Sequence, residues 1–151
     1  MEEKILILDF GSQYTQLIAR RVRELNIYCE IFPYNKAPKN IENFKGLILS
    51  GSPFSVHDVE APSVNLEEFK NIPVLGICYG AQMVAKISGC DVLKSEIREY
   101  GRAKLNYVNN SSLILDRVKS NSDVWMSHGD SIKNNKDVLE VIASTDDVEV
   151  A

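Results

Sequence analysis

Residues 73–82 of this chain, PVLGICYGAQ, decide its fold. The apolar run Pro73–Ile77 fits a strand buried on both faces, as in parallel sheets. Apolar residues between Ala81 and Ile87 then recur at helical spacing. Gly89 is placed to end that helix at its C′ position. The stretch therefore predicts a buried strand, a tight turn and a helix.

The chain before this stretch repeats the same alternation of apolar runs and helical patterns. We expect strands at 4–8, 28–32 and 46–49, and helices at 14–25 and 62–69. Ser12 is expected to be the N-cap of the first helix. Alternating strands and helices are typical of an α/β protein with a mostly parallel sheet flanked by helices, in flavodoxin-like layering.

After residue 90 the pattern changes to short apolar segments separated by polar turns. We expect strands at 91–93, 103–108, 111–115, 124–127 and 138–143, with Trp125 packed in the core. They are interpreted as an antiparallel flank of the same domain, so residues 1–151 form a single domain. A further strand pattern starts at Asp146 and stops at Ala151, so we expect this domain to be C-terminally incomplete.

Composition and charge limit the classes of function. The chain has 151 residues, of which 44% are hydrophobic and 25% charged, as in soluble globular domains. A net charge of −4 argues against nucleic acid as a partner. No apolar run approaches the roughly 20 residues of a membrane span, and no signal peptide opens the chain, so we expect a cytoplasmic protein without membrane partners. The group Arg20, Arg21 and Arg23 is interpreted as a solvated helix face.

The cysteine count of three is odd and does not indicate a disulfide framework. Cys29 and Cys90 are expected to be small buried side chains. Cys78 differs, because Gly76 and Gly80 flank it at the spacing of a nucleophile elbow.

An elbow of this kind gives a cysteine its chemistry. At a helix N-terminus the dipole favours the thiolate of Cys78, which lowers its pKa. The N–H of Tyr79 is placed to donate to an oxyanion, and a second donor is expected from the turn at Gly51. The pattern alone leaves a second interpretation open, which is a buried structural cysteine in a glycine-rich turn.

Five segments resemble one known family, in the same order along the chain. Residues 76–82 resemble the active-site motif of class I (triad-type) glutamine amidotransferases. Residues 7–16, 49–56, 98–103 and 124–130 are similar to the amidotransferase domains of GMP synthetases.

The resemblance implies that Cys78 attacks the side-chain amide of glutamine, releasing ammonia and leaving a γ-glutamyl thioester. The N–H groups of Tyr79 and Gly51 would form the oxyanion hole. The remaining implied residues bind the amino-acid end of glutamine: Gln82, Ser127, Gly129 and Asp130. No metal or cofactor is implied for this domain.

The resemblance also implies partners outside this chain. In full-length relatives, Mg-ATP binds a separate synthetase (ATP-pyrophosphatase) domain that converts XMP to GMP with the released ammonia. A dimerisation domain is implied as well, so the full-length protein is expected to be a homodimer. Arg98 and Arg102 would face the synthetase domain, order a loop, or form a solvated edge.

Two departures from the family pattern bear on activity. The oxyanion turn reads Gly51-Ser52-Pro53 instead of Gly-Gly-Pro, which still leaves the donor at Gly51. The family's His-Pro-Glu segment, which supplies the base and its orienting acid, does not occur in these 151 residues. The two histidines are His57, expected on the surface, and His128, expected to border the substrate pocket. We therefore expect this polypeptide alone to have little or no glutaminase activity.

Two other functions stay open. A catalytically silent module could bind glutamine or a partner without chemistry, as the missing base suggests. A different α/β cysteine hydrolase or redox sensor could share the elbow, although the segment 127–130 and Gln82 favour a glutamine pocket.

Overall fold

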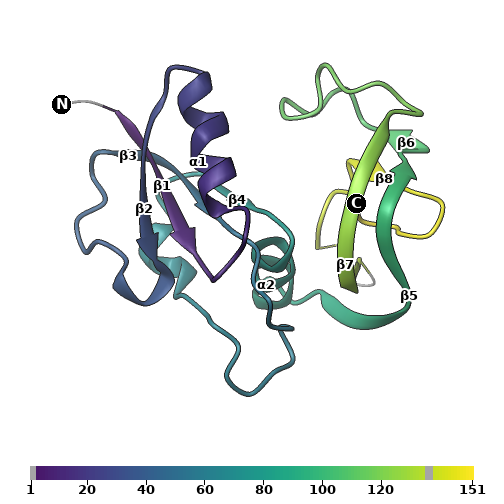
Figure 1. The fold of residues 1–151 in the computed structure, drawn as a ribbon, viewed down its shortest axis with the longest axis horizontal. Coiled ribbons are helices and arrows are strands. Elements are labelled where there is room, and N and C mark those ends of the chain that lie inside the picture. The colour runs from purple at the N-terminus through teal and green to yellow at the C-terminus, as the bar shows by residue number, and fades with distance from the viewer. Residues whose placement is uncertain (1–2, 135–137) are drawn as a thin grey trace. The chain divides into compact units, whose positions relative to one another are not determined.

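The computed structural model of the chain describes residues 3–134 and 138–151. It divides into two compact units, Met1–Val84 and Ala85–Ala151, which Figure 1 shows in purple to teal and in green to yellow. Each unit is described by itself below. No helix in the described ranges is long and apolar enough to cross a membrane.

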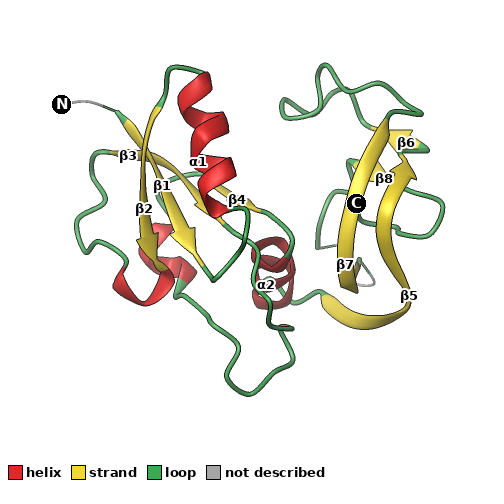
Figure 2. Ribbon diagram, viewed as in Figure 1, coloured by secondary structure: helices red, strands yellow, loops and turns green. Residues whose placement is uncertain are grey.

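The first unit contains the predicted parallel sheet (Figure 2). Its four strands lie in the order β2-β1-β3-β4, and all three neighbouring pairs are parallel. Their bounds are β1 Lys4–Asp9, β2 Tyr28–Pro33, β3 Phe44–Leu49 and β4 Val74–Gly76. The α/β fold class predicted from the sequence is confirmed.

The central strands are largely apolar, so their side chains on both faces of the sheet can be buried. In β1, the side chains of Leu6, Ile7 and Leu8 are fully buried. Ile7 packs with Ala19 and with Cys29, which is 1% exposed, as predicted for a structural cysteine. The Cys29 thiol donates to the carbonyl of Ala19 at 3.5 Å.

Helix α1 spans Thr15–Glu24, and its start differs from the prediction. Tyr14, not Ser12, occupies the N-cap position. Ser12 lies two residues earlier, where its hydroxyl accepts from the N–H of Tyr14 at 3.0 Å. The hydroxyl of Thr15 donates to the carboxylate of Asp9 at 2.8 Å. This bond joins the first residue of α1 to the end of β1.

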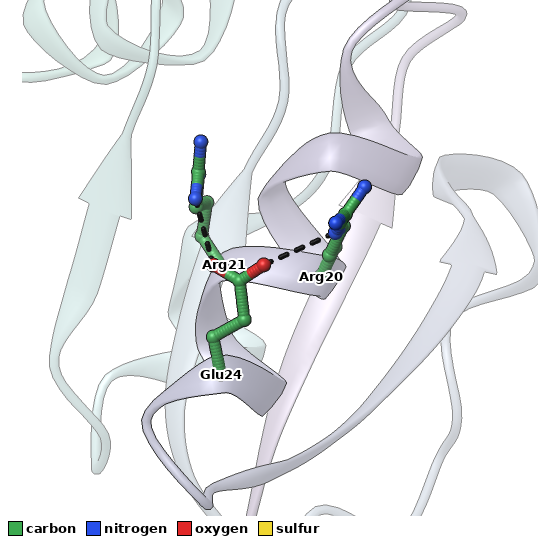
Figure 3. Close-up of polar contacts among 3 residues, drawn as sticks. All are labelled: Arg20, Arg21 and Glu24. Carbon is green, nitrogen blue, oxygen red and sulfur yellow. Dashed lines mark hydrogen bonds and ion pairs between the residues drawn. The ribbon is translucent and has the colours of Figure 1, made fainter.

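The outer face of α1 is the solvated basic face predicted from the sequence (Figure 3). Arg21 and Arg20 donate to the carboxylate of Glu24 at 2.7 and 3.1 Å. These exposed pairs lower the pKa of Glu24, with the hydrogen bond from Arg21 as the largest cause. Arg23 instead donates to the backbone carbonyl of Cys29 at 3.2 Å and so ties α1 to β2.

Two features of the first unit differ from the expectation, namely the length of one helix and the burial of one strand. The helix expected at 62–69 is only a 3-10 turn, η2 Leu66–Phe69, capped by the Asn65 side chain. A second such turn, η1 Tyr34–Lys36, follows β2. Strand β4 is the edge of the sheet, so Val74 and Leu75 are exposed and not buried as predicted.

Helix α2, Tyr79–Ile87, ends as the sequence predicts. Gly89 has φ +94°, its N–H donates to Lys86, and the N–H of Cys90 donates back to Ala85. This pair of bonds is a Schellman motif, which glycine at C′ allows. Cys90 is 4% exposed, as predicted for a structural cysteine.

The second unit is the predicted antiparallel part of the chain. Strand β5, Asp91–Lys104, pairs with β7, Asp123–Lys133, and β6, Tyr107–Val108, pairs with β8, Ala143–Ser144. Two of the expected short strands thus belong wholly or partly to one long strand, β5. The small core of the second unit is formed by Leu105, Val108 and Ala143.

Three expectations for this unit are wrong. Of the strand expected at 138–143, only Ala143 lies in a strand, at the start of β8. Residues 111–115 form turns and not a strand, because the Asn110 side chain donates to the carbonyls of Leu115 and Val118. Trp125 is 76% exposed, since strand alternation turns its neighbour Val124 towards the small core instead.

Candidate active site

Cys78 stands between β4 and α2, at the elbow that the sequence predicts. Its backbone has φ +52°, a left-handed conformation that is strained for a residue other than glycine. The N–H of Ile77 before it donates to Leu49 at 3.0 Å, and the N–H of Gln82 after it donates to the carbonyl of Cys78 at 3.0 Å. The bonds on both sides hold the strained residue in place.

The two flanking glycines allow this turn because backbone approaches both of them closely. A Cβ on Gly76 would lie 2.5 Å from the nitrogen of Ala81, and one on Gly80 would lie 2.5 Å from the carbonyl oxygen of Leu49. Neither neighbour is a flexible side chain that could move aside. The glycine spacing on which the sequence argument depends therefore has a steric cause.

The oxyanion turn after β3 reaches the nucleophile. A Cβ built on Gly51 would lie 3.6 Å from Cβ of Cys78 and 3.5 Å from the hydroxyl of Ser12. Parallel strands end at the same edge of the sheet, so the turns after β1, β3 and β4 meet there. The structure thus brings Gly51 beside Cys78.

Tyr79 is the first residue of α2, where backbone N–H groups have no partner within the helix. Its side chain is 3% exposed, and its hydroxyl donates to the carbonyl of Pro62. Its ring lies 5.8 Å from that of Phe10. Burial raises the pKa of the phenol, with smaller contributions from Asp58 and Tyr34. The buried side chain fixes the position of the backbone N–H.

The protonation of Cys78 differs from the expectation. Cys78 reaches solvent, but the protein atoms around its thiol disfavour the charged form, and this burial raises its pKa. Within the described ranges no charged side chain offsets that effect. Burial therefore opposes the thiolate that the helix N-terminus was expected to favour.

The predicted glutamine-binding residues are divided between the two units. Gln82, partly buried, lies one helical turn after Cys78 on α2. Ser127, Gly129 and Asp130 are in β7 of the second unit. Strand alternation puts Ser127 and Gly129 on one face and Asp130 on the other, so their joint part in a pocket stays a prediction.

The two histidines and the arginines Arg98 and Arg102 were also singled out from the sequence. His57 is exposed after the oxyanion turn, as predicted. The imidazole of His128 lies 3.0 Å from the carbonyl of Asp130, through Nδ1. Arg102 is exposed and pairs across the strands with Trp125, whereas the side chain of Arg98 is outside the described part of the structure.

The sequence argument missed Ser50, whose side chain is fully buried between the oxyanion turn and β1. A hydroxyl residue at the end of a buried strand, directly before a glycine turn, is the signal that could have found it. The residues that the structure describes contain no cluster of His, Cys, Asp or Glu able to hold a metal ion.

Comparison with known proteins places this fold and elbow in a class. Residues 6–151 match the glutamine amidotransferase class-I family, and the chain belongs to that family.

Within it, the chain is similar to glutamine-hydrolysing GMP synthases. It is 57% identical to that of Cytophaga hutchinsonii over 152 residues, covering 100% of this chain and 30% of the relative. It is 53% identical to that of Christiangramia forsetii, covering 98% of this chain and 29% of the relative. The chain thus spans about 30% of the length of these curated relatives.

Solved structures agree with the fold. A Thermoplasma acidophilum protein assigned as one of the subunits of a GMP synthase superimposes with a TM-score of 0.80 at 30% identity, over 99% of this chain and 76% of that one. A glutamine amidotransferase from Thermotoga maritima gives a TM-score of 0.76 at 19% identity, over 99% of this chain and 70% of that one. The latter likeness supports the fold alone.

Proposed function

We propose that this chain is the glutamine-hydrolysing part of a GMP synthase, with Cys78 as the nucleophile. The observation that carries the proposal is the left-handed backbone of Cys78 at the β4–α2 elbow, with Gly51 beside it. A strained, exposed nucleophile at a sheet edge, next to backbone donors, is the arrangement that acyl transfer requires.

The proposed reaction has two steps. The sulfur of Cys78 adds to the side-chain carbonyl of glutamine, and the N–H groups of Gly51 and Tyr79 hold the oxyanion. The C–N bond then breaks, ammonia leaves with a proton supplied by an acid, and a γ-glutamyl thioester remains on Cys78. Water cleaves the thioester to give glutamate and the free thiol.

The reaction needs a group that accepts the proton of the thiol. Because burial raises the pKa of Cys78, a base must take the thiol proton before attack. The family resemblance assigns that task to a His–Glu pair, which neither His57 nor His128 provides. We therefore propose that the 151-residue polypeptide turns over glutamine slowly when alone.

The proposal extends to the binding of glutamine and to the fate of the ammonia. We propose that Gln82, Ser127, Gly129 and Asp130 bind the amino-acid end of glutamine. The ammonia then passes to a synthetase domain in the longer protein, which uses Mg-ATP to convert XMP to GMP in the cytoplasm as a homodimer. The relatives named GMP synthase, which are about three times as long as this chain, support the proposal.

A chimera tests this proposal. In the chimera, this chain takes the place of the matching 30% of the Cytophaga hutchinsonii enzyme. The assay measures GMP formation from XMP and Mg-ATP, with either glutamine or ammonia as the nitrogen source. We expect both nitrogen sources to support GMP formation. The Cys78→Ala chimera should use ammonia alone, whereas Cys29→Ala should retain glutamine use. Glutamine-dependent synthesis by Cys78→Ala would show that the nucleophile is assigned wrongly.

The raised pKa of Cys78 favours a second candidate, a module that binds glutamine without chemistry. This candidate predicts that the chimera binds glutamine in calorimetry but forms GMP only from ammonia, with or without Cys78.

A further inference from the structure

Ser50 occupies an unusual position for a polar residue, because its side chain is fully buried where β3 ends. The hydroxyl accepts from the N–H of Phe10 at 3.0 Å and donates to the carbonyl of Gly51 at 3.0 Å. The direction is unambiguous, since the N–H of Phe10 supplies one hydrogen and the hydroxyl keeps one of its own to donate. Both hydrogen-bonding roles of the hydroxyl are therefore filled inside the protein.

The backbone of Ser50 makes two more bonds to the elements that form the site. Its N–H donates to Leu8 of β1 at 3.1 Å. Its carbonyl accepts at 3.1 Å from the N–H of Gly80, in the first turn of α2, which also donates to the carbonyl of Ile77 at 3.0 Å. One residue thus joins the ends of β1 and β3 to the elbow.

These bonds fix both peptide groups that flank Gly51. A trans peptide is planar, with its C=O and N–H pointing in opposite directions. The bond from Gly80 holds the Ser50–Gly51 peptide, so the N–H of Gly51 points away from Gly80. The Ser50 hydroxyl holds the Gly51–Ser52 peptide, so the carbonyl of Gly51 turns into the protein.

Glycine makes such a restraint necessary. A residue without Cβ samples many backbone conformations, so the Gly51–Ser52 peptide could rotate if nothing held its carbonyl. Gly51 lies beside Cys78, where a rotated carbonyl would bring a partial negative charge towards a developing oxyanion.

We propose that Ser50 is a positioning residue for the acylation of Cys78, acting as a buried latch that keeps the Gly51 carbonyl turned away from the site. The inference rests on the proposed function, because it concerns the oxyanion of that reaction. Ser50 does not touch the substrate, and its effect is transmitted through the peptide groups of Gly51.

Two reactions of Cys78 separate this role from simple folding. Glutamic acid γ-para-nitroanilide acylates the thiol: an S–C bond forms, the anilide C–N bond breaks, and para-nitroaniline leaves with a proton from water. Iodoacetamide alkylates the same thiol by displacement of iodide at a saturated carbon, so no oxyanion forms. Both rates are measured on the 151-residue chain at about pH 9.5, above the ordinary pKa of cysteine, where less help from a base is needed.

We expect Ser50→Ala to slow acylation by about 10-fold or more, since losing one whole oxyanion donor slows catalysis by about 10²–10³. Alkylation by iodoacetamide should change by less than about 2-fold. The control is Ser144→Ala, which removes a hydroxyl in β8, outside the candidate site, that donates to Asn106 at 2.8 Å, and it should leave both rates unchanged. Unchanged acylation in Ser50→Ala, or an equal fall in both rates, would overturn the latch.

Ser50→Thr keeps the hydroxyl and provides a rescue if Ser50→Ala does not fold. We expect its acylation rate to lie within about 3-fold of the parent. If Ser50→Ala folds, acylation of Ser50→Thr as slow as that of Ser50→Ala would contradict the proposal. If Ser50→Ala does not fold, acylation of Ser50→Thr at least about 10-fold slower than that of the parent would contradict it.

Amide hydrogen exchange distinguishes failure of the latch from failure of the proposed function. The Phe10 amide should lose protection in Ser50→Ala, because its acceptor is gone. If the parent is alkylated but never acylated, the glutaminase proposal fails and the role of Ser50 in acylation fails with it, although loss of the Phe10 protection would still confirm the hydrogen bond to Ser50. If the parent is acylated and the Phe10 amide keeps its protection, the latch is wrong.

Discussion

Substitution of Gly80 by alanine tests the steric basis of the elbow. A Cβ at this position would lie 2.5 Å from the carbonyl oxygen, 2.7 Å from Cβ and 2.9 Å from the carbonyl carbon of Leu49. Because two of these atoms belong to the backbone of β3, relief requires α2 or β3 to shift by about 0.5–1 Å. Overpacking of this kind costs about 1–3 kcal/mol.

The same shift strains the bond from the Gly80 N–H to the carbonyl of Ser50, 3.1 Å long. Loss of a buried hydrogen bond adds about 1 kcal/mol. We therefore expect Gly80→Ala to lower the free energy of unfolding by about 2–4 kcal/mol. With a urea m-value of about 2 kcal/mol/M, the midpoint falls by about 1–2 M.

Gly51→Ala is the matched control, because it adds the same methyl group in the same unit. Its Cβ would meet its nearest neighbours at 3.5, 3.6 and 3.8 Å, which are ordinary contact distances. We expect it to stay within about 1 kcal/mol of the parent. Unfolding is followed by circular dichroism at 222 nm, since the one tryptophan, Trp125, reports only on the second unit. Equal midpoints for the two variants would refute the steric account.

Three further predictions concern Cys78 and its neighbour. Cys78→Gly should be about 1 kcal/mol more stable than Cys78→Ala in urea unfolding, because glycine relieves the strain at φ +52°; equal stability would show that no strain is stored there. Because burial raises the pKa of Cys78, its alkylation rate should rise with a midpoint above the roughly 8.5 of a free thiol. The folded state accordingly loses stability as pH rises from about 8.5 through the higher folded pKa, a loss that Cys78→Ala should lack. Tyr79→Phe should lower stability by about 1–2 kcal/mol, since the buried carbonyl of Pro62 loses its donor, yet it should keep the acylation rate because the backbone N–H remains.

Much of the fold could be predicted because burial leaves a clear mark on sequence. The run Lys4–Leu8 is apolar at nearly every position because β1 is covered on both faces. Gly89 could be assigned to the end of α2 because a left-handed C′ residue selects glycine. The elbow was predictable for a similar reason, since backbone contacts at Gly76 and Gly80 exclude any side chain.

Other features depended on competition between polar groups, which spacing does not reveal. Ser12 has the chemistry of an N-cap, but its hydroxyl bonds to Tyr14 and the helix starts at Thr15. Residues 111–115 have an apolar pattern suited to a strand, but the Asn110 side chain holds the chain in turns. Both outcomes follow from local side-chain to backbone bonds that offer an alternative to regular structure.

In the candidate site, the sequence indicated that Gly51 lies beside Cys78 but not the protonation of the nucleophile. A helix N-terminus favours the thiolate of Cys78 and burial disfavours it, and the structure shows burial as the cause of a raised pKa. The two effects act on the same atom with opposite sign, so residue spacing alone could not decide between them.

Geometry and ionisation are therefore separate properties of this site. The backbone of Cys78 is already in its strained conformation, and the Ser50 bonds already fix the peptides around Gly51. The raised pKa of Cys78 disfavours the thiolate, which is also the form of cysteine most easily oxidised. We infer that such a site becomes reactive when a base takes the proton from Cys78, without any rearrangement of the elbow.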